Sequence, residues 1–128
     1  MLVNGYEIGA EPTSEEIGDR KEQLMESKII GAAIRYLEMS GREILEADFC
    51  GFAVFHDEGK IVLAKIDWAR DDYPNIRVRR RDYERAMRSL VEHYGFVDCP
   101  FRLDTIGVNV LSDSRAIVRH EINAQPRK

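Results

Sequence analysis

Apolar residues recur at helical spacing in the first third of the chain. The residues Thr-Ser-Glu-Glu at positions 13–16 have the form of a capping box and predict the start of a helix. Gly41 predicts its end, while Gly18 and Gly31 interrupt the pattern, so residues 13–39 form one helix or two. The apolar positions of this region are Ile17, Leu24, Met25, Ile30, Ala33, Ile34 and Leu37. We expect the segment before this helix to be irregular.

Short apolar runs separated by turn residues follow this helical region. Residues 44–49, 52–57 and 61–68 are predicted strands, and the turn at 57–60 joins the last two in a hairpin. Residues 61–64 are continuously apolar, which is typical of a strand buried on both faces and central in its sheet.

A second amphipathic helix follows the polar connector at residues 70–75. Its apolar positions are Tyr83, Met87, Leu90, Val91 and Tyr94, and Gly95 predicts its end. Alternation at Ile106, Val108 and Val110 predicts a strand, and residues 116–122 predict the last one. The order α-β-β-β-α-β-β predicts an α/β domain with helices covering a central mixed sheet.

Composition agrees with a single globular domain of 128 residues. No apolar run approaches the roughly 20 residues that span a bilayer, and the N-terminal residues lack the pattern of a secretory signal. We therefore expect a cytoplasmic protein with no membrane partner. Cys50 and Cys99 have no CxxC partner, so we expect them to be reduced, structurally buried thiols rather than ligands or a disulfide.

The charges are unevenly distributed, although the net charge is only −4. Acidic residues dominate positions 1–26, whereas arginines dominate positions 70–88. The acidic stretch at residues 13–26 offers a surface for a protein partner, or a cover for the basic segment through opposite charge.

A longer pattern connects these elements. Residues 33–46, AIRYLEMSGREILE, resemble the A-x-x-Y-L-x-x-x-G-y-x-I-L-E segment of the YraN-like family of uncharacterised proteins. The likeness continues through the hairpin after Gly51, the helix at 81–94, the strand at 101–104 and the ending at 119–124. It implies a restriction-endonuclease-like fold.

The resemblance also implies a division of the chain. Residues 27–124 would form the nuclease-like α/β domain, residues 1–26 an acidic, partly helical extension, and residues 125–128 a polar tail.

The same resemblance implies a place for a PD-(D/E)xK-type site. In such a site, carboxylates bind a divalent cation that activates water for attack on a phosphodiester, and a lysine helps to orient that water. The family's helix glutamate, hairpin aspartate, strand glutamate and strand lysine fall here on Ile30, Val54, Lys65 and Asp67. None of the four is retained, so the chain is a degenerate member with no catalytic residue assigned.

Two interpretations of Lys65 and Asp67 remain open. They lie on one face of their strand and would form an ion pair. Alternatively, Asp67 belongs to a relocated endonuclease site that needs Mg or Mn, in which Asp48 or Glu46 replaces a lost carboxylate. His56, His93 and His120 fit no metal or catalytic motif and are expected to be structural or exposed.

The arginines supply the positive evidence for function. Arg81, Arg85 and Arg88 fall on one helix face, close to Arg77, Arg79 and Arg80. They would bind the phosphates of DNA or RNA weakly, and Tyr73 and Tyr83 would add base stacking. The alternative is an ordinary solvated face, with Glu84 and Arg88 paired.

Three functional hypotheses follow. The first is a catalytically inactive nuclease-like domain that binds nucleic acid or regulates, and the second is a protein-interaction module that uses residues 13–26. The third is the metal-dependent endonuclease with relocated residues.

Overall fold

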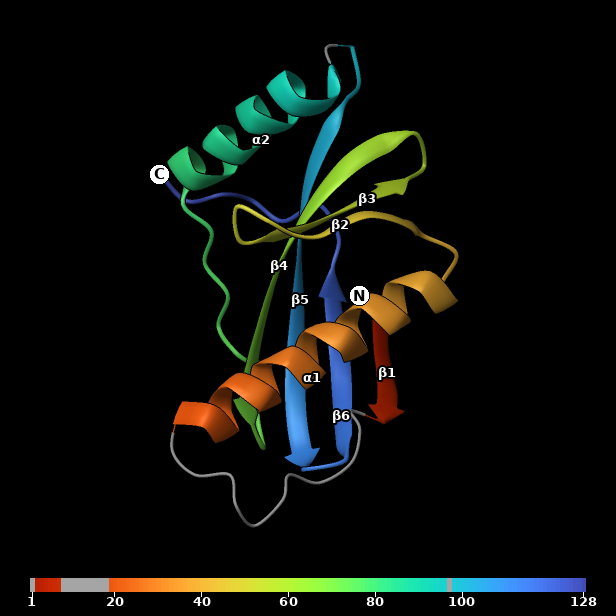
Figure 1. Ribbon diagram of the computed structural model, residues 1–128, viewed down its shortest axis with the longest axis vertical. Coiled ribbons are helices and arrows are strands. Elements are labelled where there is room, and N and C mark those ends of the chain that lie inside the picture. The colour runs from red at the N-terminus through yellow and green to blue at the C-terminus, as the bar shows by residue number, and fades with distance from the viewer. Residues whose placement is uncertain (1, 8–18, 97) are drawn as a thin grey trace.

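A six-stranded mixed sheet forms the centre of the protein in the computed structural model, which describes residues 2–7, 19–96 and 98–128. Its strand order is β1-β6-β5-β4-β3-β2 (Figure 1). The strands are β1 (Leu2–Glu7), β2 (Glu43–Phe49), β3 (Phe52–Asp57), β4 (Lys60–Arg70), β5 (Phe101–Ser112) and β6 (Arg115–Glu121). The helices are α1 (Asp19–Met39) and α2 (Arg80–Tyr94). Strands β4 and β5 are parallel because the connection through α2 returns the chain to the same end of the sheet, and the other pairs are antiparallel.

The two helices cover opposite faces of the sheet. Alternate residues of β3 and β4 point to opposite sides, so Phe55 and Val62 pack in the core with α1. Val54 and Leu63 pack in the second core with Leu90 of α2. Both cores therefore depend on the buried central strands that the apolar run at 61–64 predicts.

The predicted order α-β-β-β-α-β-β is confirmed from α1 onward, but the expectation of an irregular beginning is wrong. Residues Leu2–Glu7 form β1, which pairs antiparallel with β6 along the edge of the sheet. Its sequence, LVNGYE, has a polar residue and a glycine at its centre and so lacks an alternating pattern. Backbone pairing to an available edge therefore determines this strand.

Helix α1 is continuous over residues 19–39, so this range forms one helix and not two. It runs through the predicted domain boundary after residue 26 without a break. The predicted capping box lies outside the described residues. No described helix is long and apolar enough to cross a membrane.

Both cysteines are free, as expected, but both are exposed, so the expectation of burial is wrong. Cys50 lies in the tight turn between β2 and β3, where its φ of 53° and the φ of 85° at Gly51 reverse the chain. Turn residues of this kind lie at the surface because the neighbouring strands provide the core.

The connector from β4 to α2 lies across the face of β5. A Cβ atom on Gly107 would stand 3.3 Å from Cδ of Pro74, so the absence of a side chain at Gly107 lets the two backbones approach. This packing leads the chain from one end of the sheet to the start of α2 (Figure 1).

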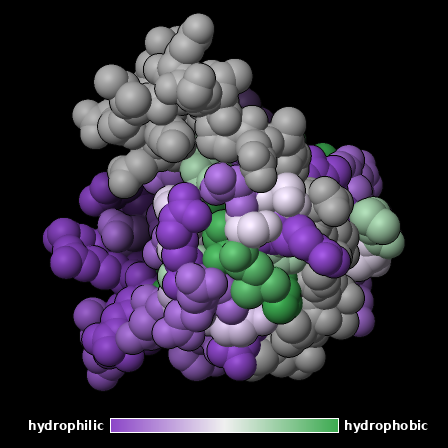
Figure 2. Space-filling view, turned by 90° about the horizontal axis from the view of Figure 1, so that it is seen from below, coloured by the Kyte–Doolittle hydropathy of each residue, from purple (hydrophilic) through white to green (hydrophobic). Residues whose placement is uncertain are grey.

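At the end of the sheet opposite the start of α2, near the β5–β6 turn, Figure 2 shows hydrophilic side chains bordering a small apolar patch.

A buried polar network crosses the core on the α1 side. Asp104 of β5 has no exposed surface, and its two oxygens accept hydrogen bonds of 2.8 Å from Nε and Nη2 of Arg102. One of these oxygens lies 2.7 Å from Nε2 of His120, whose Nδ1 lies 2.7 Å from the Tyr36 hydroxyl of α1. The backbone N–H of Asn123 donates the remaining bond, at 3.0 Å. His120 is therefore structural, as predicted.

The network reaches the β3–β4 hairpin through Asp57. Its Oδ2 accepts a hydrogen bond of 2.8 Å from Arg102 and lies 3.4 Å from Nε of Arg42, which makes an ion pair without hydrogen-bond geometry. Side chains from α1, β3, β5 and β6, and Arg42 just after α1, are thus held together.

Opposing effects act on the ionisation of this network. Burial alone would raise the pKa of Asp104, but the hydrogen bonds from His120, Arg102 and Asn123 together lower it below the ordinary value. Burial alone would lower the pKa of Arg102, and its bonds to Asp104 and Asp57 raise it instead. Both groups are therefore charged in the folded protein.

We expect Asp104→Asn to lower the free energy of unfolding by about 3 kcal/mol at neutral pH, because it removes one of the two carboxylates that pair with the buried guanidinium of Arg102 and the carboxylate that contacts His120. Urea denaturation measures this. The control is Asp113→Asn, which removes the exposed ion pair with Arg70 and should cost under about 1 kcal/mol. Because the pKa of Asp104 is lowered on folding, its stabilisation is present above about pH 4 and is lost as pH falls toward the folded pKa. The free energies of unfolding of the wild type and of Asp104→Asn should therefore converge in acid. A difference that stays constant with pH would contradict this account.

Candidate nucleic-acid interface

Strand β4 is longer than its neighbour β3, and this mismatch shapes the surface. The last pair on this side joins Ala53 to Ala64, so Lys65–Arg70 continue without a β3 partner. The turn at Cys50 and Gly51 carries the chain away at this point. Two pockets open beside this part of β4, which pairs with β5 but not with β3, and Lys65 lines both pockets.

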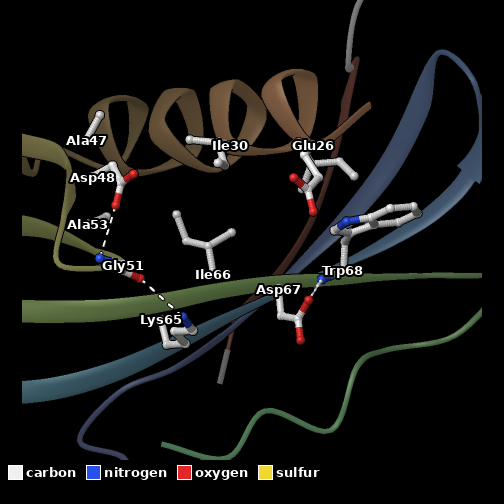
Figure 3. Close-up of a pocket in the computed structure, with 11 residues that line it drawn as sticks. Glu26, Ile30, Ala47, Asp48, Gly51, Ala53, Lys65, Ile66, Asp67 and Trp68 are labelled. Carbon is white, nitrogen blue, oxygen red and sulfur yellow. Dashed lines mark hydrogen bonds between the residues drawn. The ribbon is translucent and has the colours of Figure 1, made fainter. Parts of the chain in front are cut away.

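The first pocket lies between α1 and β4 and has a volume of about 210 Å³ (Figure 3). Its carboxylates are Glu26, Asp48 and Asp67, and Figure 3 shows Glu26 and Asp48 at opposite ends. Oδ1 of Asp48 accepts a bond of 3.1 Å from the N–H of Gly51, and Oδ1 of Asp67 accepts one of 2.8 Å from the N–H of Trp68. Among the described residues, no group of three His, Cys, Asp or Glu side chains is arranged to hold a metal ion.

Three of the four positions matched to the family site line this pocket. Ile30 lies on α1, and Lys65 and Asp67 lie on β4. Val54 has no exposed surface and packs in the α2-side core instead. Glu26 was not among the candidates, because its place one turn before Ile30 has meaning only once α1 lies over the pocket.

The predicted ion pair between Lys65 and Asp67 is not formed. Nζ of Lys65 donates to the carbonyl of Gly51 at 3.4 Å and stands 5.8 Å from the centre of the Phe52 ring. Glu46, the other proposed replacement carboxylate, lies outside the pocket and accepts a hydrogen bond from the Tyr94 hydroxyl. That hydrogen bond is the main cause that raises the pKa of Tyr94.

All six predicted arginines are exposed, and we call them the arginine surface. They are Arg77, Arg79, Arg80, Arg81, Arg85 and Arg88. None of them makes an ion pair within the described part of the chain, and the expected pair between Glu84 and Arg88 is also not formed. These charges are therefore not neutralised by the ion pairs expected of a solvated helix face.

Part of the arginine surface converges on Lys65. Arg77, Arg79 and Arg85 line the second pocket together with Lys65, and we call it the cationic pocket. Arg80, Arg81 and Arg88 lie outside it. The convergence was not predicted, since Lys65 was assigned to Asp67.

The polar tail lies beside the start of α2 (Figure 1). Arg127 bridges to Arg79, and its carbonyl accepts a hydrogen bond from the N–H of Arg80. Arg127 and Lys128 are exposed there and extend the basic surface. No local sequence pattern predicts this pairing.

The two tyrosines proposed for base stacking are occupied by other contacts. The guanidinium of Arg119 stands 4.6 Å from the centre of the Tyr73 ring. Tyr83 packs against the α2-side core, and burial raises its pKa. Of residues 13–26, the expected partner-binding stretch, positions 13–18 lie outside the described residues.

No protein-family model matches this chain, and its sequence shows no significant match to a curated protein. The resemblance to the YraN-like family therefore stays a prediction.

Val54 and Ile30 should respond very differently to an introduced carboxylate. Val54→Asp places a charge in the apolar core and should lower the free energy of unfolding by at least about 3 kcal/mol. Ile30 is 38% exposed, so Ile30→Glu should cost less than about 1 kcal/mol. Thermal denaturation compares the two. Equal stability of both variants would contradict the inward orientation of Val54.

Proposed function

We propose that this chain is a catalytically inactive nuclease-like domain that binds nucleic acid weakly through the arginine surface. The observation that carries the proposal is that six exposed arginines make no ion pair with a described residue, and that three of them line one pocket with Lys65. A guanidinium presents several N–H donors in a planar fork that fits phosphate oxygens.

The charge of the whole chain makes this local excess informative. With a net charge of −4, the protein has enough carboxylates to pair these arginines, yet the nearby Asp82 and Glu84 form no ion pair with them. Clustered like charges repel one another, and an anionic ligand relieves that repulsion. The acidic total opposes long-range attraction of nucleic acid, which is why we propose weak binding.

The nuclease-like part of the proposal rests on architecture and on the resemblance together. The order α-β-β-β-α-β-β, the mixed sheet and a helix on each face are what the resemblance implies. The proposal that the domain is catalytically inactive rests on the chemistry of the site. The hairpin position that should carry an aspartate holds the buried Val54, and Asp48 and Asp67 bond to nearby backbone N–H groups.

Binding should weaken steeply as salt rises, because arginines that contact phosphates release condensed counterions. We expect Arg81→Gln with Arg85→Gln to reduce the slope of log affinity against log salt by about 1.5 for a single strand. Fluorescence anisotropy with single- and double-stranded oligonucleotides measures the slope. The matched control, Arg70→Gln with Arg115→Gln, removes two exposed charges outside the arginine surface and should leave the slope nearly unchanged.

The acidic N-terminal region should compete with phosphate. Deletion of residues 1–26 is a poor test, since it removes β1 and the buried Met25 of α1. Amide substitution of Glu15, Glu16, Asp19 and Glu22 isolates their charge and should tighten binding. If neither the wild type nor the amide-substituted variant binds an oligonucleotide at low salt, the nucleic-acid proposal fails. The protein-interaction module then becomes the better hypothesis.

The purified protein should not cleave DNA or RNA when Mg²⁺ or Mn²⁺ is added. In the pocket that would hold the reaction, Glu26 and Asp48 lie at opposite ends, whereas a metal-activated water needs ligands that converge on one ion (Figure 3). A labelled oligonucleotide and a titration of either ion test this. Metal-dependent cleavage that disappears in Asp67→Ala would contradict the proposal and support the relocated site.

A further inference from the structure

The cationic pocket is a concave site whose lining carries more positive than negative side chains. Its volume is about 340 Å³, and it is lined by Cys50, Phe52, Lys65, Arg77, Val78, Arg79, Asp82 and Arg85. These residues come from the β2–β3 turn, β3, β4, the connector and the first turns of α2. Four positive side chains thus face one carboxylate, from parts of the chain that only the fold brings together.

The positive charges of this pocket have few internal partners. Lys65 donates one long hydrogen bond, at 3.4 Å, to the Gly51 carbonyl and keeps its other N–H groups for a ligand. Arg77, Arg79 and Arg85 make no ion pair with a described residue, and neither does Asp82.

The start of α2 adds to the positive potential. Arg79 is the N-cap residue of this helix, and its side chain makes no capping hydrogen bond. The positive end of the helix dipole therefore coincides with the guanidinium groups of Arg77, Arg79 and Arg85. Asp82 in the first turn offsets part of this charge.

The excess of three positive charges indicates which kind of phosphate fits best. A phosphodiester within a strand carries one negative charge, whereas a phosphomonoester carries about −1.5 to −2 at pH 7 and has an additional free oxygen. The pocket volume lies near the lower end of the range of about 300–1,000 Å³ for small-ligand sites. A pocket of this size suits the end of a single nucleic-acid strand better than a duplex.

We infer that the cationic pocket binds the terminal phosphate of a nucleic-acid strand, an inference that rests on the proposed function. Lys65, Arg77, Arg79 and Arg85 hold the phosphate oxygens, and Phe52 forms an apolar wall beneath Lys65. Arg80, Arg81 and Arg88 lie outside the pocket and contact the following backbone phosphates. The protein therefore prefers strands with a phosphorylated end.

The test compares single-stranded oligonucleotides of one sequence that carry a 5′-phosphate, a 3′-phosphate or only hydroxyl ends. Anisotropy should show about tenfold tighter binding of a phosphorylated form, as expected for additional charge-assisted hydrogen bonds. Lys65→Gln with Arg79→Gln should abolish this preference. The control variant Arg88→Gln, which lies on α2 but outside the pocket, should weaken all three ligands equally and keep the preference.

Cys50 supplies an independent readout, because it lines the pocket and Cys99 does not. The chain has two cysteines, so Cys99→Ser leaves Cys50 as the only thiol. The phosphorylated oligonucleotide should slow alkylation of Cys50 at concentrations that saturate binding. Inorganic phosphate should protect only at much higher concentrations.

The possible outcomes separate this inference from the proposed function. Equal, salt-dependent binding of all three oligonucleotides overturns the terminal-phosphate site and leaves the arginine surface in place. Saturating binding with no protection of Cys50 also overturns it. Protection by inorganic phosphate as strong as that by the oligonucleotide makes the pocket a site for free phosphate, and absence of all binding overturns both proposals.

Discussion

The carboxylate of Asp104 is buried in the sheet and bonded on both oxygens, and the rest of the structure is organised around it. It fixes Arg102, which holds Asp57 at the end of β3, and His120, which holds Tyr36 of α1. A buried charge is costly unless every bond is made, so this network is stable only when α1, β3, β5 and β6 are all in place. It therefore favours one arrangement of the helix on the sheet.

That arrangement leaves the proposed binding surface at the opposite side of the central strands. The β3–β4 hairpin is anchored at Asp57, and its other end opens where β4 extends past Ala53. Lys65 lies at this opening, beside the cationic pocket at the start of α2. The connector over Gly107 and the tail that bridges at Arg127 bring the arginines to the same place. The proposed binding surface is thus a consequence of unequal strand lengths and of how two irregular segments pack.

The sequence predicted the elements whose apolar pattern is strong. The continuous run at 61–64, the helical stripe of α2 and the alternation in β5 all correspond to observed elements. Strand β1 was missed because pairing with β6, and not its own side-chain pattern, determines it.

The candidate site was predictable only in part. The exposure of Arg81, Arg85 and Arg88 follows from their spacing on a helix. The convergence of Arg77, Arg79 and Arg85 with Lys65 does not, because residues 12 or more positions apart meet only through the tertiary fold. The expected Lys65–Asp67 pair fails for a related reason: past the end of β3, Lys65 bonds to the turn at Gly51 instead. The network of Tyr36, Asp104 and His120 joins residues up to 84 positions apart and left no local signal.

The central claim is that nucleic acid binds where α2 begins, and amide chemical shifts of the ¹⁵N-labelled protein test it most directly. On titration with a short single strand that carries a terminal phosphate, the largest shifts should fall at Cys50, Gly51, Lys65 and residues 77–85. Residues of α1 and of the pocket around Glu26 and Trp68 should shift little. Shifts concentrated in that pocket, or no shifts at a saturating concentration, would contradict the account.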